Sequence, residues 1–138
     1  KKHERWKKNQ SRFIPIGEIE HQNFIQHLTE GKARYVMKKH SDEERPHADI
    51  RQVQRMISIY DLKDIITHGW VIERNYFPYE QAVRLVILGY TRNYRPLHVV
   101  CEVVNDYFWL VCTVYDPQSK PYKWSNNFQE RVCFCKED

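Results

Sequence analysis

Two strands near the C-terminal end constrain the fold of this chain more than any other feature. They are Leu97–Val104 and Phe108–Tyr115, separated by the turn residues Asn105 and Asp106. Side chains of a strand alternate between the two faces of a sheet, so every second residue shares a face. One face of this hairpin is wholly apolar and is expected to pack on a core; it reads Leu97, Val99, Cys101, Val103, Phe108, Leu110, Cys112 and Val114.

The opposite face of the hairpin carries polar and aromatic groups. A two-residue turn places His98 opposite Thr113, with Tyr115 one step along, and Trp109 on the same face. We expect this face to be open to solvent. Its histidine, tyrosine and hydroxyl groups are either a site for acid–base chemistry or ordinary solvated strand residues.

The rest of the chain reads as helices followed by strands. Residues 13–20 are expected to be an extended lead-in, and apolar spacing predicts helices over 21–31, 47–56 and 58–69. Strands are expected at 33–39, 70–74, 83–90, 97–104 and 108–115, and a last strand at 131–134. This order predicts an α+β fold, in which N-terminal helices pack on one face of a twisted antiparallel sheet of four to five strands.

The basic surplus of the chain belongs to its N-terminal end. The 138 residues hold 22 Lys/Arg and 18 Asp/Glu, of which residues 1–12 hold six and one; the remainder therefore has 16 basic and 17 acidic residues. We expect a basic arm over residues 1–19 and one domain over 20–138. The arm is either a solvated leader or a binder of phosphates or an acidic partner.

Cofactor and membrane signals are missing from the sequence. It contains no phosphate-binding loop, dinucleotide fingerprint or His–Glu-x-x-His motif, so we expect no cofactor and no metal. Cys101 and Cys112 fit the core, and the Cys133-x-Cys135 pair lacks zinc spacing, which favours a reducing, cytoplasmic location. No long apolar segment or secretory signal is present, so no membrane partner is expected.

A series of motifs resembles a known family of small bacterial domains, DUF4258. The motifs span roughly residues 20–132 and are, in order, Arg34-Tyr35 with His40, Ile57–Leu62, Gly69–Glu73, Leu85–Tyr90, Arg95–Val100, Thr113–Pro117, and Trp124 with Phe128 and Arg131. The family has no assigned function. Its members look like relatives of the barnase–colicin–RelE ribonuclease toxins, which implies a barnase- or RelE-like fold and a metal-independent ribonuclease.

Two histidines compete for the position that the family places after its first strand. His40 has the right spacing from Arg34 and Tyr35, whereas His47 has the right spacing to Ile57 and is followed by Arg51 and Arg55. Metal-free RNA cleavage needs a base, an acid and cations around the phosphate. The candidate catalytic set is therefore His47, His40, Arg51, Arg55, His98 and Tyr115.

A second set of residues is suited to holding RNA. Arg34, Lys38 and Lys39 either bind phosphate or keep an edge strand from aggregating, and Trp109 and Thr113 lie on the expected open face. Together with these residues, the resemblance to DUF4258 implies a toxin-type ribonuclease with RNA as substrate and a cognate antitoxin or immunity protein as partner. It acts in the cytoplasm of its own or a target cell. The alternative is a non-catalytic module that binds RNA or protein; group transfer from a nucleotide cofactor has no binding loop to support it.

Overall fold

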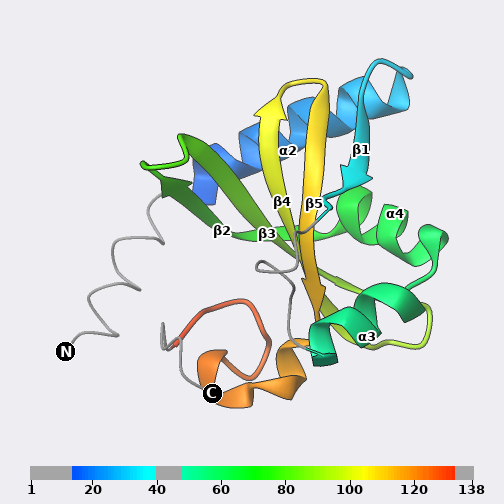
Figure 1. Ribbon diagram of the computed structural model, residues 1–138, viewed down its shortest axis with the longest axis vertical. Helices are drawn as coiled ribbons and strands as arrows, with labels where there is room; N and C mark the ends of the chain where they lie inside the picture. Colours follow the sequence, from blue (N-terminus) through cyan, green and yellow to red (C-terminus); the bar gives the residue numbers. More distant parts are fainter. Residues whose placement is uncertain (1–13, 40–47, 133–138) are drawn as a thin grey trace.

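A computed structural model describes residues 14–39 and 48–132 of the chain. Among these residues, helix α2 (Ile14–Thr29) comes first and is followed by the short strand β1 (Arg34–Met37) and by helices α3 (Ala48–Met56) and α4 (Ile59–His68). Four strands then form a meander, β2 (Trp70–Phe77), β3 (Ala82–Tyr90), β4 (Pro96–Asn105) and β5 (Phe108–Tyr115). Two short 3₁₀ turns, η2 (Pro117–Ser119) and η3 (Pro121–Lys123), end the described fold (Figure 1).

The expected α+β class is confirmed, with one difference in strand direction. The sheet has the order β1-β5-β4-β3-β2, and its last four strands along the chain pair antiparallel. β1 pairs parallel with β5, so the sheet is mixed. A parallel pair needs a long crossover connection, and the chain that runs through α3, α4 and the meander supplies it here.

Helix α2 is longer than the sequence predicted, because residues 14–20 are helical and not extended. Gly17 allows the helix to lie close to the sheet, since a Cβ there would come within 3.1 Å of Val71 and 3.2 Å of Leu85. Arg74 of β2 pairs with Glu20 at 2.5 Å and ties the same part of α2 to the sheet. Helix α4 begins as expected at Ser58, whose hydroxyl accepts a hydrogen bond from the Asp61 amide at 2.9 Å.

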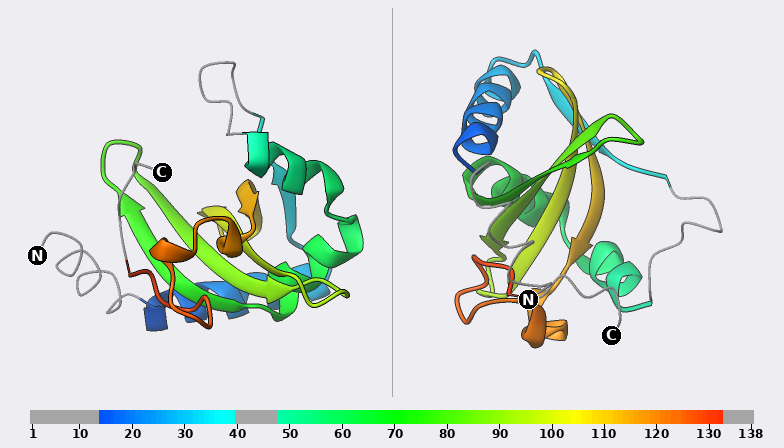
Figure 2. Two further views of the ribbon diagram at one scale, coloured as in Figure 1. Left: turned by 90° about the horizontal axis from the view of Figure 1, so that it is seen from below. Right: turned by 90° about the vertical axis from the view of Figure 1, so that its left-hand side faces the viewer.

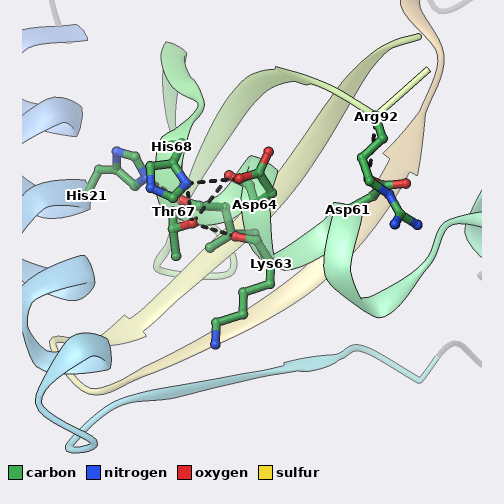
Figure 3. Close-up of polar contacts among 8 residues, drawn as sticks. His21, Asp61, Lys63, Asp64, Thr67, His68 and Arg92 are labelled. Atoms are coloured by element: carbon green, nitrogen blue, oxygen red, sulfur yellow. Dashed lines mark hydrogen bonds and ion pairs between the residues drawn. The ribbon is translucent and has the colours of Figure 1, made fainter. Parts of the chain in front are cut away.

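Helices α2 and α4 cover one face of the sheet and meet there (Figures 1 and 2). The buried His21 ring of α2 donates from Nε2 to the Ile66 carbonyl of α4 at 2.6 Å. Figure 3 shows this contact region together with the polar contacts of α4, including Asp64 with His68 and Asp61 with Arg92. The main core lies under these helices and contains Phe24, Ile65, Ile66, Leu85, Ile87, Leu97, Val99, Trp109 and Val111.

The C-terminal segment, which we define as residues 116–132, lies on the other face of the sheet (Figure 2). Its buried Trp124 packs on Ile72, Val86 and Leu88, with Phe128 beside them. The expected last strand is reduced to an isolated bridge between Trp124 and Arg131, and residues 133 and 134 lie outside the described residues. The sheet therefore has cover on both faces, but its second face is covered only in part.

A β-bulge in β5 corrects the predicted faces of the hairpin. Thr113 pairs with Val100 and Val111 with Cys101, so Cys112 is an extra residue and the alternation of β5 reverses at this point. Trp109 consequently points into the main core and is fully buried, and the prediction that it lies on an open face is wrong. The predicted register is also shifted, because His98 lies opposite Tyr115 and not opposite Thr113.

The contact between Phe24 and Trp109 gives a direct test of this packing. The two rings stack with centroids 4.1 Å apart, and both side chains are fully buried. We expect Phe24→Ala to lower the free energy of unfolding by about 3–5 kcal/mol, measured by chemical denaturation, because a cavity replaces the ring. The control is Ile19→Ala on the same helix, where the side chain is 61% exposed and the expected change is within about 0.5 kcal/mol. Equal effects of the two changes would contradict the buried position of Phe24.

Candidate functional site

A cleft of about 300 Å³ opens on the second face of the sheet, beside the C-terminal segment. We call it the sheet cleft. Its lining comes from three parts of the fold: the sheet (Asn75, Phe77, Arg84, Val86, Val100, Thr113, Tyr115), the start of α3 (Asp49, Ile50) and the C-terminal segment (Asp116, Pro117, Ser119, Lys120, Lys123, Trp124, Arg131).

Cations outnumber carboxylates in the lining of the sheet cleft. Four basic side chains, Arg84, Lys120, Lys123 and Arg131, face two acidic ones, Asp49 and Asp116. Ion pairs with other parts of the protein hold several of these charges in place. Arg84 contacts Glu80 at 2.6 Å and Glu102 at 3.3 Å, Arg131 contacts Glu73, and Asp116 contacts Arg95 at 2.7 Å. The two lysines of the C-terminal segment add further positive charge to the rim.

A chain of hydrogen bonds behind the cleft holds Tyr115 in place. Arg131 donates two hydrogen bonds to the buried carboxylate of Glu73, at 2.6 Å from Nε and 2.9 Å from Nη2, and is also hydrogen-bonded to Tyr115. The Tyr115 hydroxyl lies 3.1 Å from His98 Nδ1, and His98 Nε2 lies 2.9 Å from the Phe128 carbonyl. Since a carbonyl only accepts, Nε2 carries the proton of the neutral ring, and Tyr115 donates to Nδ1.

Burial sets the protonation of this chain of groups. It lowers the pKa of His98 to about 4, although the hydrogen bond to Phe128 partly opposes the shift. Burial also raises the pKa of the Tyr115 hydroxyl, with Arg131 acting in the opposite direction. Desolvation acts to lower the pKa of Arg131, but its hydrogen bonds and proximity to Glu73 prevail and raise it. Near neutral pH His98 is therefore uncharged and Tyr115 protonated.

The prediction that His98 lies on an open face is wrong. Its side chain is 0% exposed, the Trp124 ring packs on it with centroids 4.2 Å apart, and both of its nitrogens are hydrogen-bonded. A group that exchanges a proton with a substrate must come within hydrogen-bond reach of it. His98 instead fixes the orientation of Tyr115, which does line the sheet cleft.

The basic residues of α3 do not join the described cleft. A helix turns by about 100° per residue, so Arg51 and Arg55 share one side of α3 and lie about 120–160° around it from Asp49 and Val53. Asp49 borders the sheet cleft, and neither arginine is among the described residues that line it. The two arginines do share a helix face, as their spacing predicts, but the helix presents a different side to the cleft.

Some of the other predicted site residues line the sheet cleft, and others do not. Thr113 and Tyr115 line the sheet cleft, whereas Arg34, Lys38 and Lys39 lie on or just after the edge strand β1 and are not part of the lining. The Arg34 guanidinium lies over the Phe108 ring, 5.0 Å from its centroid. His40 and His47 lie outside the described residues.

Sequence reasoning missed Phe77, Arg84, Lys120 and Lys123. Phe77 is 36% exposed, and the Arg84 guanidinium lies 4.6 Å from its ring centroid. A signal for Arg84 was present, since it falls on the same face of β3 as Val86 and Leu88 and directly opposite Glu102. Nothing in the local sequence placed the two lysines, because they reach the cleft only through the path of the C-terminal segment.

The described residues offer no grouping typical of a metal centre. Within residues 14–39 and 48–132, no three histidine, cysteine or acidic side chains are grouped so as to hold a metal ion. No helix in the same part of the chain is both long and apolar enough to span a membrane. Cys101 and Cys112 are buried, as expected.

Comparison with known proteins identifies one family. Residues 45–116 match the model of a family described as "Domain of unknown function (DUF4258)". No curated protein and no solved structure matches the chain.

Titration of His98 makes the stability of the fold depend on pH. Its pKa is about 4 in the folded protein against an ordinary value of 6.5, so the unfolded state binds a proton more readily between these values. The contribution of His98 to stability is complete above about pH 6.5 and decreases as the pH falls towards 4. We expect the free energy of unfolding to drop by about 3 kcal/mol across this window from His98 alone.

The matched control for this prediction is His98→Gln, whose amide can donate to Phe128 and accept from Tyr115. Denaturant unfolding between pH 4 and 7 is compared for the two proteins. In the variant, the free energy of unfolding should change less with pH, because the part of this slope that is due to His98 is gone. The buried His21, whose pKa is also lowered by burial, should account for some of the slope that remains. Identical slopes in the two proteins would contradict the assignment of His98 as a buried neutral histidine.

Proposed function

Because this chain belongs to the DUF4258 family, whose description assigns no function, we propose its activity from geometry: the domain binds RNA in the sheet cleft. The observation that carries this proposal is the exposed ring of Phe77 beside four cationic side chains in one cleft. Single-stranded nucleic acid is commonly held by aromatic rings that stack on bases and by cations that follow the phosphates.

The chemistry of the lining supports a phosphate-bearing ligand. Lys120 and Lys123 place ammonium groups at the rim. Arg84 and Arg131 use two N–H donors each on the carboxylates of Glu80, Glu102 and Glu73, and only their remaining N–H groups can meet a phosphate. Thr113 adds a hydroxyl group to the same wall of the cleft. Because RNA is present in the cytoplasm, we expect the domain to act there, either in its own cell or in a target cell.

Removal of the aromatic platform tests RNA binding. We expect Phe77→Ala to weaken the binding of a short fluorescein-labelled single-stranded RNA by about 1–3 kcal/mol, measured by fluorescence anisotropy. Lys120→Gln together with Lys123→Gln should weaken binding and lower the salt slope by about 0.7 for each phosphate that the protein no longer neutralises.

Matched controls lie on helix α4, which covers the opposite face of the sheet. Tyr60→Ala removes a 71% exposed ring, and Lys63→Gln removes an exposed ammonium group, both outside the lining of the cleft. If the wild-type domain does not bind RNA, or if the control changes weaken binding as much as the cleft changes, the proposal fails. A protein partner would then be the remaining use of this surface.

Cleavage of the bound RNA is the second candidate function, and the hydroxyl of Tyr115 is the observation that favours it. In a metal-free reaction the 2′-oxygen attacks phosphorus and the bond from phosphorus to the 5′-oxygen breaks. A base takes the 2′-hydroxyl proton, and an acid protonates the leaving 5′-oxygen. Tyr115 stays protonated near neutral pH, as the acid must, and Arg131 can stabilise the tyrosinate left after transfer. To donate to the 5′-oxygen, the Tyr115 hydroxyl first has to leave the hydrogen bond that it donates to His98.

The candidates for the base that takes the 2′-hydroxyl proton are then His40 and His47, which precede α3 in the sequence. His98 acts through Tyr115 as a positioning residue. In this form the protein is a toxin-type ribonuclease, with a cognate antitoxin or immunity protein as its partner.

Replacement of the Tyr115 hydroxyl tests the cleavage reaction. We expect wild-type protein to convert RNA to products with 2′,3′-cyclic phosphate ends at a rate that EDTA does not change. Tyr115→Phe should slow this reaction by about 10²–10⁴-fold. Tyr60→Phe, which removes an exposed hydroxyl on α4, is the control and should leave the rate unchanged. Intact RNA after incubation with saturating wild-type protein would exclude cleavage and leave RNA binding as the function.

A further inference from the structure

A second cavity of about 380 Å³ lies next to the sheet cleft, on the side of α3. Its lining includes residues absent from that of the sheet cleft, among them Gln52 and Met56 of α3, Arg95 of the loop before β4, and Gln118 of η2. The cavity is therefore formed between a helix, a strand connection and the C-terminal segment, and we call it the α3 cavity.

The two cavities adjoin each other at Tyr115. Five residues line both of them: Asp49, Ile50, Tyr115, Asp116 and Ser119. They come from the start of α3, the end of β5 and the start of the C-terminal segment. A ligand that fills both cavities must therefore pass beside Tyr115, the residue that the hydrogen-bond chain through His98 and Arg131 holds in place.

The size of each cavity limits what it can hold. Small-molecule sites usually measure about 300–1,000 Å³, so each cavity is at the lower end and suits one nucleotide, not an oligomer. An unpaired base can enter such a cavity, whereas a base within a duplex cannot, because its edges and faces are covered.

The lining of the α3 cavity has the chemistry to read a base. Gln52 and Gln118 are exposed amides, and an amide can both donate to and accept from the edge of a base. Met56 is 70% exposed and offers an apolar surface to the ring. The Arg95 guanidinium is fixed by an ion pair with Asp116 of the same lining at 2.7 Å, so the charge of each is balanced by the other.

We propose that the sheet cleft and the α3 cavity are adjacent nucleotide subsites on one path for single-stranded RNA, which passes beside Tyr115. This inference rests on the proposed function and adds the class of ligand, which is an unpaired strand with a minimum of two nucleotides. In the sheet cleft one base stacks on Phe77, and in the α3 cavity its neighbour meets Gln52 and Gln118.

A comparison of one- and two-nucleotide probes tests the inference without any mutation. The probes are adenosine monophosphate and adenylyl-adenosine with a 2′-O-methyl group on its first ribose, which blocks transesterification. We expect the dinucleotide to bind the wild-type domain at least about tenfold more tightly, measured by isothermal titration calorimetry, because it occupies both subsites.

Substitutions in the α3 cavity then locate the second subsite. Gln52→Ala with Gln118→Ala should reduce the affinity ratio of dinucleotide to mononucleotide to within about twofold of one. Gln129→Ala is the matched control, since Gln129 is an exposed amide of the C-terminal segment outside both linings.

The outcomes separate the inference from the proposed function. If both probes bind equally and Phe77→Ala weakens both, the domain binds RNA but the second subsite does not exist. If neither probe nor a longer single strand binds, the proposed function fails and the inference fails with it. If the affinity ratio of dinucleotide to mononucleotide stays high in the variant with Gln52→Ala and Gln118→Ala, the second subsite does not lie in the α3 cavity.

Discussion

The buried ion pair between Glu73 and Arg131 is the contact on which the second face of this molecule depends. It joins the edge strand β2 to the end of the C-terminal segment through two hydrogen bonds, 58 residues apart in the chain. Because the Glu73 side chain is 5% exposed, removal of Arg131 would leave a buried carboxylate without its counter-ion, which is strongly unfavourable. The pair therefore fixes the segment in one position, and Trp124, which lies under the Arg131 guanidinium, can close over His98.

This closure creates the candidate site by covering only part of the sheet. The apolar half of the second face, around Ile72 and Leu88, lies beneath Trp124 and is protected from water. The other half, with Phe77, Arg84 and Thr113, remains as the wall of the sheet cleft. The same segment thus forms the core contact, the boundary of the cleft and three of its four cations. The sheet cleft therefore depends on the C-terminal segment, and the hairpin of β4 and β5 alone would not form it.

The candidate acid–base groups illustrate how burial changes the role of a residue. A histidine in a strand near a tyrosine was a reasonable candidate for proton transfer, and the two do form a hydrogen bond. Burial, however, keeps the ring neutral and uses both of its nitrogens internally. His98 then acts as a fixed acceptor that holds the side chain of Tyr115, which lines the cleft. Among the described residues, the polar groups that line the sheet cleft include the tyrosine, the arginines and the lysines.

Local patterns in the sequence determined the elements of this protein. Apolar periodicity located α3, α4 and the meander, Ser58 marked the start of α4, and the motifs from Arg95 to Val100 and from Thr113 to Pro117 indicated the family. These features are readable because capping, helical spacing and strand alternation act between residues close in the chain. Only the tertiary structure decided which faces these elements present. One extra residue, Cys112, reversed the alternation of β5 and buried Trp109, and contacts from residues 124–131 sealed His98. Bulges and long-range contacts depend on how distant segments pack, so the energies that select them are absent from any local stretch of sequence.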